Sequence, residues 1–185
     1  MKIGLTGYAE TGKDAVADQL VEEFGFVKIN MSDALDKYLR ILNPYIAATI
    51  GFGGAILAVR YVDLVETVGY VEAKKHPEVR RLLQTLGTEV GRSIDPLVWV
   101  KELAKEAAKH DRVVTTGIRY RNEVTPSMTL IRVDRPGYGP LNDHSSEDLE
   151  GVFKLARNVI HNSSDLEGLK VTTRVMADCL GIHPV

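Results

Sequence analysis

Short apolar runs alternate along the chain with stretches that have the spacing of amphipathic helices. Five runs are predicted to be β-strands: residues 2–6, 26–29, 113–118, 128–133 and 158–161. Strands separated by helical segments are typical of a parallel sheet with helices covering it. The pattern therefore predicts the α/β class.

Helices are predicted where apolar residues recur every three or four positions. These positions are Val16, Leu20 and Phe24 in one helix, and Leu83, Leu86 and Val90 in another. Residues 101–110 are rich in good helix formers. The sequence Ser164-Asp165-Leu166-Glu167 fits a capping box that opens a last helix, with Met176 and Leu180 on its apolar side and Gly181 at its end.

Two segments do not fit this alternation. Residues 43–77 have no clear period, and residues 134–146 are loop-like, with prolines and glycines among charged groups. Loops of the second kind often close over substrates. Residues 46–59 are nearly all apolar but too short to span a bilayer as a helix. They are interpreted as a buried segment, a surface for a homodimer, or a loop over a ligand.

Composition narrows the class of protein. The 185 residues suit one domain, and 44% hydrophobic and 26% charged residues are typical of a globular protein. A net charge of −2 predicts no general attraction to nucleic acid polymers or anionic membranes. The single cysteine, Cys179, rules out an internal disulfide, and the first strand begins too early to leave room for a signal peptide. We expect a cytoplasmic protein.

The sequence Gly7-Tyr8-Ala9-Glu10-Thr11-Gly12-Lys13 matches G-x-x-x-x-G-K and lies between a predicted strand and a predicted helix. In that context the motif predicts a phosphate-binding loop, because its backbone N–H groups point at the anion and its lysine supplies a positive charge. The expected phosphate-binding residues of ATP are Gly7, Ala9, Glu10, Thr11, Gly12, Lys13, Asp14 and Ala15.

Asp14 stands where this motif usually has Ser or Thr as a magnesium ligand. A carboxylate is also a hard oxygen ligand, so Asp14 is a candidate to hold Mg²⁺ directly or through water. Alternatively, it is only a favourable residue in the first turn of a helix.

A helix over residues 81–92 would align residues 81, 84, 88 and 92 on a polar face and residues 83, 86 and 90 on an apolar one. Gln84 could read a base edge, Thr88 a sugar or base, and Arg92 could clamp a phosphate. A solvated face would look the same. Trp99 could stack on a base or belong to the core.

The strand at 113–118 is followed directly by Arg119, at the sheet edge where ligands of open α/β folds gather. Arg119 and Arg121 are suited to neutralising a phosphoryl group in transfer. Arg132 and Arg135, at the end of the next strand, have the same interpretation, as residues of a lid. Surface arginines near a sheet edge are the alternative for all four.

Several segments together resemble the bacteriophage deoxynucleoside monophosphate kinases, a branch of the P-loop nucleoside monophosphate kinases. The resemblance covers nearly the whole chain. It is carried by residues 7–14, residues 83–89 with Arg92 and Trp99, Ile118-Arg119-Tyr120-Arg121-Asn122-Glu123, His144-Ser145-Ser146-Glu147, and Ile160-His161-Asn162.

The resemblance implies a three-layer P-loop fold in a single domain, residues 1–185, with an acceptor-binding helical region at about 31–100 and a lid at about 134–146. It implies ATP and Mg²⁺ as the donor system, a deoxynucleoside monophosphate as acceptor, and the host cytoplasm as the place of action. The implied roles are catalytic for Lys13, Arg92 and Arg119, and acceptor-binding for Asp33, Gln84, Thr88, Arg92 and Trp99.

The metal site departs from the family pattern. Gly117 stands where relatives often have Asp, so magnesium would depend on Asp14, Asp33 and water. Two other readings stay open: a P-loop kinase for another small acceptor such as dephospho-coenzyme A, and a nucleotide-binding regulator that has lost catalysis.

Overall fold

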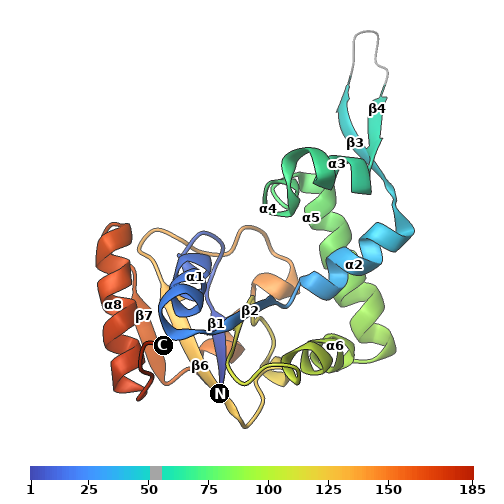
Figure 1. The fold of residues 1–185 in the computed structure, drawn as a ribbon. Coiled ribbons are helices and arrows are strands. Elements are labelled where there is room, and N and C mark those ends of the chain that lie inside the picture. Colours follow the sequence, from blue (N-terminus) through green and yellow to red (C-terminus); the bar gives the residue numbers. More distant parts are fainter. Residues whose placement is uncertain (51–55) are drawn as a thin grey trace. The chain divides into compact units, whose positions relative to one another are not determined.

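The chain divides into two compact units in a computed structural model that describes residues 1–50 and 56–185. The first unit comprises Met1–Met31 and Trp99–Val185, and the second comprises Ser32–Val98. The first unit contains a parallel sheet with the strand order β2-β5-β1-β6-β7, of which Figure 1 labels β1, β2, β6 and β7. Its strands are β1 (Lys2–Thr6), β2 (Val27–Asn30), β5 (Val113–Thr116), β6 (Met128–Asp134) and β7 (Asn158–His161).

Helices cover both faces of this sheet. They are α1 (Lys13–Phe24), α6 (Val98–Ala107), the short α7 (Glu150–Phe153) and α8 (Leu166–Cys179), with 3₁₀ turns at Arg121–Glu123 and Ser145–Glu147. Val114 packs in the cluster that includes α1 and α8, whereas its neighbour Val113 packs against Leu103 and Ala107 of α6. Because consecutive strand residues face opposite sides, the sheet is the middle of three layers. The predicted α/β fold class is confirmed.

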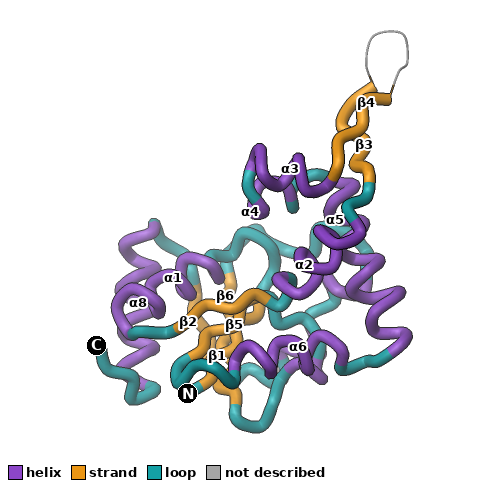
Figure 2. Tube along the Cα trace, turned by 45° about the vertical axis from the view of Figure 1, so that its right-hand side comes forward, coloured by secondary structure: helices purple, strands orange, loops and turns teal. Residues whose placement is uncertain are grey.

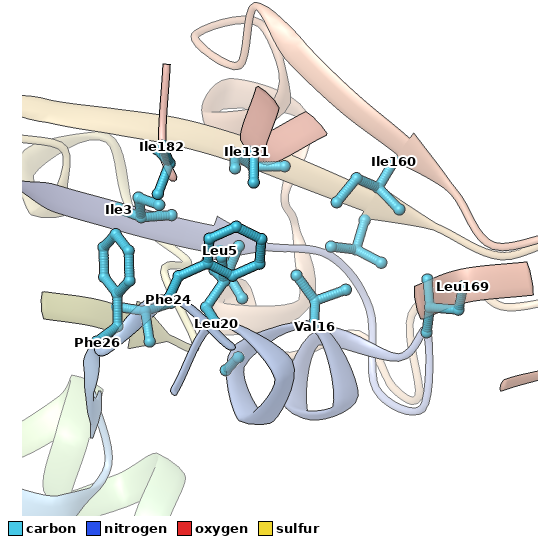
Figure 3. Packing of buried hydrophobic residues seen from close by; sticks show 14 residues of the cluster. Ile3, Leu5, Val16, Leu20, Phe24, Phe26, Ile131, Ile160, Leu169 and Ile182 are labelled. Carbon is cyan, nitrogen blue, oxygen red and sulfur yellow. The ribbon is translucent and has the colours of Figure 1, made fainter. Parts of the chain in front are cut away.

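The main core lies between α1, α8 and one face of the sheet (Figure 3). Val16, Leu20 and Phe24 follow one side of α1 and are almost fully buried, as the helical spacing predicts. They pack against Ile3 and Leu5 of β1. Burying each such side chain contributes about 1.5–3 kcal/mol, so α1 is firmly fixed against the strand that precedes it.

Some predicted boundaries in this unit were wrong. The strand predicted to reach residue 118 ends at Thr116, since Gly117 adopts a positive φ of 80°. The helix predicted over 101–110 runs from Val98 to Ala107. The cap of α8 is Asp165, whose carboxylate accepts a hydrogen bond from the backbone N–H of Gly168 at 2.9 Å, instead of Ser164.

The second unit contains helices and an antiparallel pair of strands. Figure 2 colours its helices purple and its strands orange. Its elements are α2 (Asp33–Leu42), β3 (Tyr45–Ile50), β4 (Ile56–Arg60), α3 (Tyr61–Val68), α4 (Tyr70–Ala73), α5 (Pro77–Gln84) and a π-helical segment, Thr85–Arg92. Across the described residues 1–50 and 56–185, no helix has both the length and the apolar character needed to cross a membrane.

The small core of this unit explains why residues 43–77 show no clear period. Each short element contributes only one or two side chains to this core. Its buried residues are Leu39, Ile46, Tyr61, Val65, Ala73 and Val79. Within the apolar segment 46–59, Ile46 is fully buried, and residues 51–55 lie outside the described part. The homodimer surface stays a prediction.

The helix predicted over 81–92 is α-helical only as far as Gln84 and π-helical beyond it. A π-helix has more residues per turn than an α-helix, so the predicted apolar face is lost in the second half. Leu83 and Leu86 pack against the small core, but Val90 is 44% exposed, and Gly87 and Gly91 are the buried residues. The prediction that Val90 lies on the buried face was wrong.

Candidate active site

The predicted phosphate-binding loop joins the carboxyl end of β1 to α1. Gly7 and Gly12 have positive φ values of 148° and 101°. A Cβ atom on Gly7 would collide with the carbonyl oxygen of Val133 and lie 2.9 Å from the hydroxyl of Thr11. The loop therefore needs glycine at position 7, both for its backbone conformation and for its approach to β6.

Asn162, which follows β7, supports this loop from the far end of the sequence. It is 6% exposed, and its Nδ2 donates to the carbonyl oxygen of Thr11 at 3.0 Å. A Cβ atom on Gly12 would lie 2.7 Å from the same Nδ2. The amide thus fixes the loop where the chain enters α1.

The N-terminus of α1 is the part of this loop where an anion would meet backbone N–H donors. Its N-cap, Gly12, has no side chain to form a capping hydrogen bond. The first N–H groups of an α-helix have no partner within the helix, and the helix dipole adds partial positive charge there. A phosphate group would satisfy these donors.

Lys13 lies in the first turn of α1 with its ammonium folded back over the loop. Its Nζ donates to the carbonyl oxygen of Tyr8 and lies 3.5 Å from the hydroxyl of Thr11. Burial lowers the pKa of Lys13 to about 8, and the positive charge of Arg119 acts in the same direction. The charges of Asp14 and Glu147 partly oppose this shift. The ammonium is therefore poorly solvated, and an anion would stabilise its charged form.

Asp14 is exposed and forms an ion pair with Lys28 at 2.9 Å. Its side chain is 69% exposed, so a metal ion could reach it. No group of three or more metal-binding side chains occurs among residues 1–50 and 56–185. Mg²⁺ commonly binds one or two carboxylates together with phosphates and water, so Asp14 stays a predicted ligand for it.

Arg119 follows β5 at the same edge of the sheet as the loop. The turn before it is joined to β1, because the hydroxyl of Thr6 donates to the carbonyl oxygen of Ile118 at 2.8 Å and Ile118 N–H donates to Leu5 at 3.2 Å. Its Nη1 donates to Glu147 at 2.7 Å. Its positive charge acts with burial to lower the pKa of Lys13.

The two arginines predicted for the lid have different surroundings. The guanidinium of Arg135 lies 4.7 Å from the ring centroid of Tyr138 and donates to the carbonyl oxygen of Glu10 in the phosphate loop at 3.3 Å. Arg132 instead donates to Asp134 at 2.5 Å and covers the ring of Phe153 at 4.1 Å. Of these two arginines, Arg135 is the one whose guanidinium donates to the phosphate loop.

The predicted acceptor residues Asp33, Gln84, Thr88 and Arg92 belong to the second unit. Asp33 lies exposed in the first turn of α2, and Arg92 donates to the carbonyl oxygen of Pro96 at 3.3 Å. Trp99, in the first unit, is 5% exposed in α6. Their acceptor-binding roles, like that of the 134–146 loop as a lid, stay predictions.

Three buried polar residues near the site were not predicted to have a role: Glu123, Glu147 and Asn162. Each lies in a segment that carries the family resemblance. Nothing in their spacing along the sequence indicates that they are buried. Glu147 and Asn162 bond to residues far away in the sequence, Arg119 and Thr11, whereas Glu123 bonds to the nearby backbone of Arg119. A polar residue inside such a segment is the one sequence signal that could have pointed to them.

The sequence matches no family model and no curated protein. Among solved structures it is similar to the shikimate kinase from Aquifex aeolicus, with 15% identity and a TM-score of 0.48 over 98% of this chain and 99% of that chain. Similarity at this level says nothing about the substrate, so function has to follow from the site.

Proposed function

We propose that this protein is a P-loop kinase that transfers the γ-phosphoryl group of ATP to a deoxynucleoside monophosphate. The observation that carries the proposal is the convergence of Lys13, the N-terminus of α1 and Arg119 at the carboxyl edge of the parallel sheet. Two cations and a row of helical N–H donors suit a polyphosphate.

In the proposed reaction, an oxygen of the acceptor's 5′-phosphate attacks the γ-phosphorus in line, and the bond to the oxygen bridging the β- and γ-phosphorus breaks. The products are a deoxynucleoside diphosphate and ADP. The protein's task is to position both nucleotides and stabilise the charge that spreads over the transferring group. The α1 N-terminus and Lys13 would hold the donor phosphates, and Arg119 would contact the transferring group.

Magnesium would accompany ATP and neutralise charge on its phosphate oxygens, with Asp14 the residue of the first unit that would hold it. Asp33 is the second predicted ligand. Asp14 lies in the first turn of α1, where its carboxylate is paired with Lys28.

Gln84, Thr88 and Arg92 support the choice of acceptor. They lie in one continuous helical stretch at spacings of four residues. An amide, a hydroxyl and a guanidinium match the base, the sugar and the phosphate of a nucleotide. The family resemblance of this stretch points to a deoxynucleotide.

Closure of the 134–146 loop would exclude water and suppress ATP hydrolysis. The contact between Arg135 and the carbonyl oxygen of Glu10 gives the start of that loop a direct connection with the phosphate loop.

The proposal is tested by measuring ADP formation with dTMP, dGMP, dCMP, dAMP, the four ribonucleotides and dephospho-coenzyme A. We expect turnover with at least one deoxynucleotide. Lys13→Ala should lose at least about 100-fold in kcat/KM, since it removes a charge that stabilises the transferring phosphates. Lys154→Ala, which changes a lysine that is 76% exposed, is the matched control and should leave the rate unchanged.

Other outcomes point elsewhere. Turnover with dephospho-coenzyme A alone would mean that this molecule, and not a deoxynucleotide, is the acceptor. Tight ATP binding without turnover on any acceptor would favour the regulator, an alternative suggested by Asp14 and Gly117. A folded Lys13→Ala variant with wild-type rate would contradict the site itself.

A further inference from the structure

Glu147 is a buried carboxylate beside the candidate active site. It ends the 3₁₀ turn Ser145–Glu147 and is 3% exposed. Its Oε1 accepts a hydrogen bond from Nη1 of Arg119 at 2.7 Å, and Nη1 also donates to the carbonyl oxygen of Ser146 at 2.7 Å. A carboxylate this well buried requires a compensating charge, and Arg119 supplies it.

The backbone at Arg119 is held by a second buried carboxylate. Oε2 of Glu123, which is 2% exposed, accepts the N–H groups of Arg119 at 2.7 Å and of Tyr120 at 3.0 Å. Arg119 is thus fixed at both ends, the backbone by Glu123 and the guanidinium by Glu147. A long side chain that is ordered in advance loses less entropy when it binds a phosphoryl group.

Glu147 also contacts the loop predicted to be a lid. Its Oε2 accepts the N–H of Leu141 at 3.4 Å. The turn that carries Glu147 is held in shape by His144, whose Nδ1 accepts the N–H of Ser146 at 3.1 Å. One side chain therefore connects Arg119 with the loop.

Lys13 at the start of α1, Arg119 after β5 and Glu147 in the Ser145–Glu147 turn are linked by the Arg119–Glu147 hydrogen bond and by the effect of both charges on Lys13. The charge of Arg119 lowers the pKa of Lys13, and the charge of Glu147 raises it. Glu147 offsets one of two neighbouring cations and leaves a net positive charge for a phosphate. Because a guanidinium has five N–H donors, Arg119 can bind Glu147 and a phosphoryl oxygen at the same time.

We propose that Glu147 is a positioning residue for Arg119 in phosphoryl transfer, and that it links this arginine to the 134–144 segment through the backbone N–H of Leu141. The inference rests on the proposed function. In its geometry, the two carboxylate oxygens of Glu147 accept hydrogen bonds from Arg119 and from the backbone N–H of Leu141, and this does not depend on which molecule accepts the phosphoryl group.

The test compares Glu147→Gln with Glu150→Gln, which changes an exposed glutamate three residues away. Glu147→Gln keeps the size and the acceptor oxygen but removes the charge. We expect kcat to fall about 10- to 100-fold, with the KM for ATP changed less than about threefold. The upper pH limb of ATP binding, set by Lys13, should move to lower pH. Glu150→Gln should change none of these quantities.

Glu147→Asp separates charge from geometry. It keeps the negative charge and shortens the side chain, so the pH limb should return towards that of the wild type while kcat stays reduced. Hydrogen exchange in residues 134–144 should be faster in Glu147→Ala than in the Glu150→Gln control, because the acceptor for Leu141 is lost.

A double-variant comparison of kcat tests whether Glu147 acts through Arg119. In an Arg119→Gln background, adding Glu147→Gln should cause no further loss of kcat. That double variant also has no unpaired buried charge, so it remains testable if the single variant does not fold. A further loss of kcat in the double variant, or an unchanged pH limb and unchanged loop exchange in folded single variants, would overturn the inference.

Failure of the proposed function has a different signature. A wild-type protein that binds ATP but transfers its phosphoryl group to no acceptor would refute the kinase proposal. The pH limb of ATP binding and the exchange of the 134–144 segment would still report on Glu147.

Discussion

Asp14 and Asp18, one helical turn apart on α1, share a single partner. Each carboxylate has its Oδ1 2.9 Å from Nζ of Lys28, and both are well exposed. Asp14 lies in the first turn of the helix, beside Lys13, whereas Asp18 lies one turn further from the phosphate loop. The pair therefore separates a role in metal binding from a general effect of negative charge.

Asp14→Asn should raise the Mg²⁺ concentration needed for half-maximal turnover about 10-fold, because it removes the carboxylate of the first unit that we propose to hold the ion. Asp18→Asn should leave that concentration unchanged. Both are measured by titrating Mg²⁺ at saturating ATP. Equal responses of the two variants would mean that Asp14 is only a favourable residue in a helical first turn.

At the scale of elements, α2 and α3 are joined by a hydrogen bond within the second unit. The hydroxyl of Tyr61, a fully buried residue, donates to Oδ1 of Asp36 at 2.7 Å. Oδ2 of the same carboxylate accepts from Arg40 at 2.8 Å. This network stands next to the small core, so it fixes the helix that begins with Asp33.

Tyr61→Phe should destabilise the second unit by about 1–2 kcal/mol, since it removes a hydrogen bond to a charged group that keeps its other partner. Tyr138→Phe, at a position 38% exposed, is the control and should stay within about 0.5 kcal/mol of the wild type. The measurement is urea unfolding of both variants, with the hydrogen exchange of Asp33–Leu42 used to follow the second unit. Equal unfolding midpoints for the two variants would show that the hydroxyl contributes nothing.

At the scale of the whole molecule, the low pKa of Lys13 makes ATP binding and stability depend on pH. The pKa is lowered by burial to about 8 from an ordinary value of 10.5. Phosphates beside the ammonium would raise it again. ATP binding near pH 9 should therefore take up protons, and titration calorimetry in two buffers of different ionisation enthalpy measures the number. Lys13→Ala should abolish the uptake, and uptake that survives would exclude this lysine as its source.

The stability effect has a definite sign. Between pH 8 and pH 10.5 the unfolded chain holds more protons at Lys13 than the folded one, so this group's contribution to the free energy of unfolding rises with pH. Below pH 8 Lys13 is charged in the folded protein, and the cost of burying that charge is present in full. The difference in free energy of unfolding that this charge causes between wild type and Lys13→Ala should therefore shrink as the pH rises from 8 to 10.5.

Much of the fold was predictable because local pattern decides it. The strands of the sheet, the helix with Val16, Leu20 and Phe24 on one side, and the phosphate loop each have a signal within about 20 residues of sequence. The role of Lys13 was predicted from the same local signal and stays a prediction. The short elements of residues 43–77 could not, because their buried side chains, such as Ile46, Tyr61 and Ala73, complete a core only when all of them are assembled.

The sequence by itself determined the α/β class and the loop that would bind phosphate, since strand alternation, helical spacing and glycine conformation act between near neighbours. Tertiary structure alone decided that Arg119 meets Glu147, 28 positions away, and that Asn162 holds Thr11, 151 positions away. Burial turned Glu147 from an ordinary acidic residue in a loop into a charge that requires a partner, and burial depends on how distant segments pack.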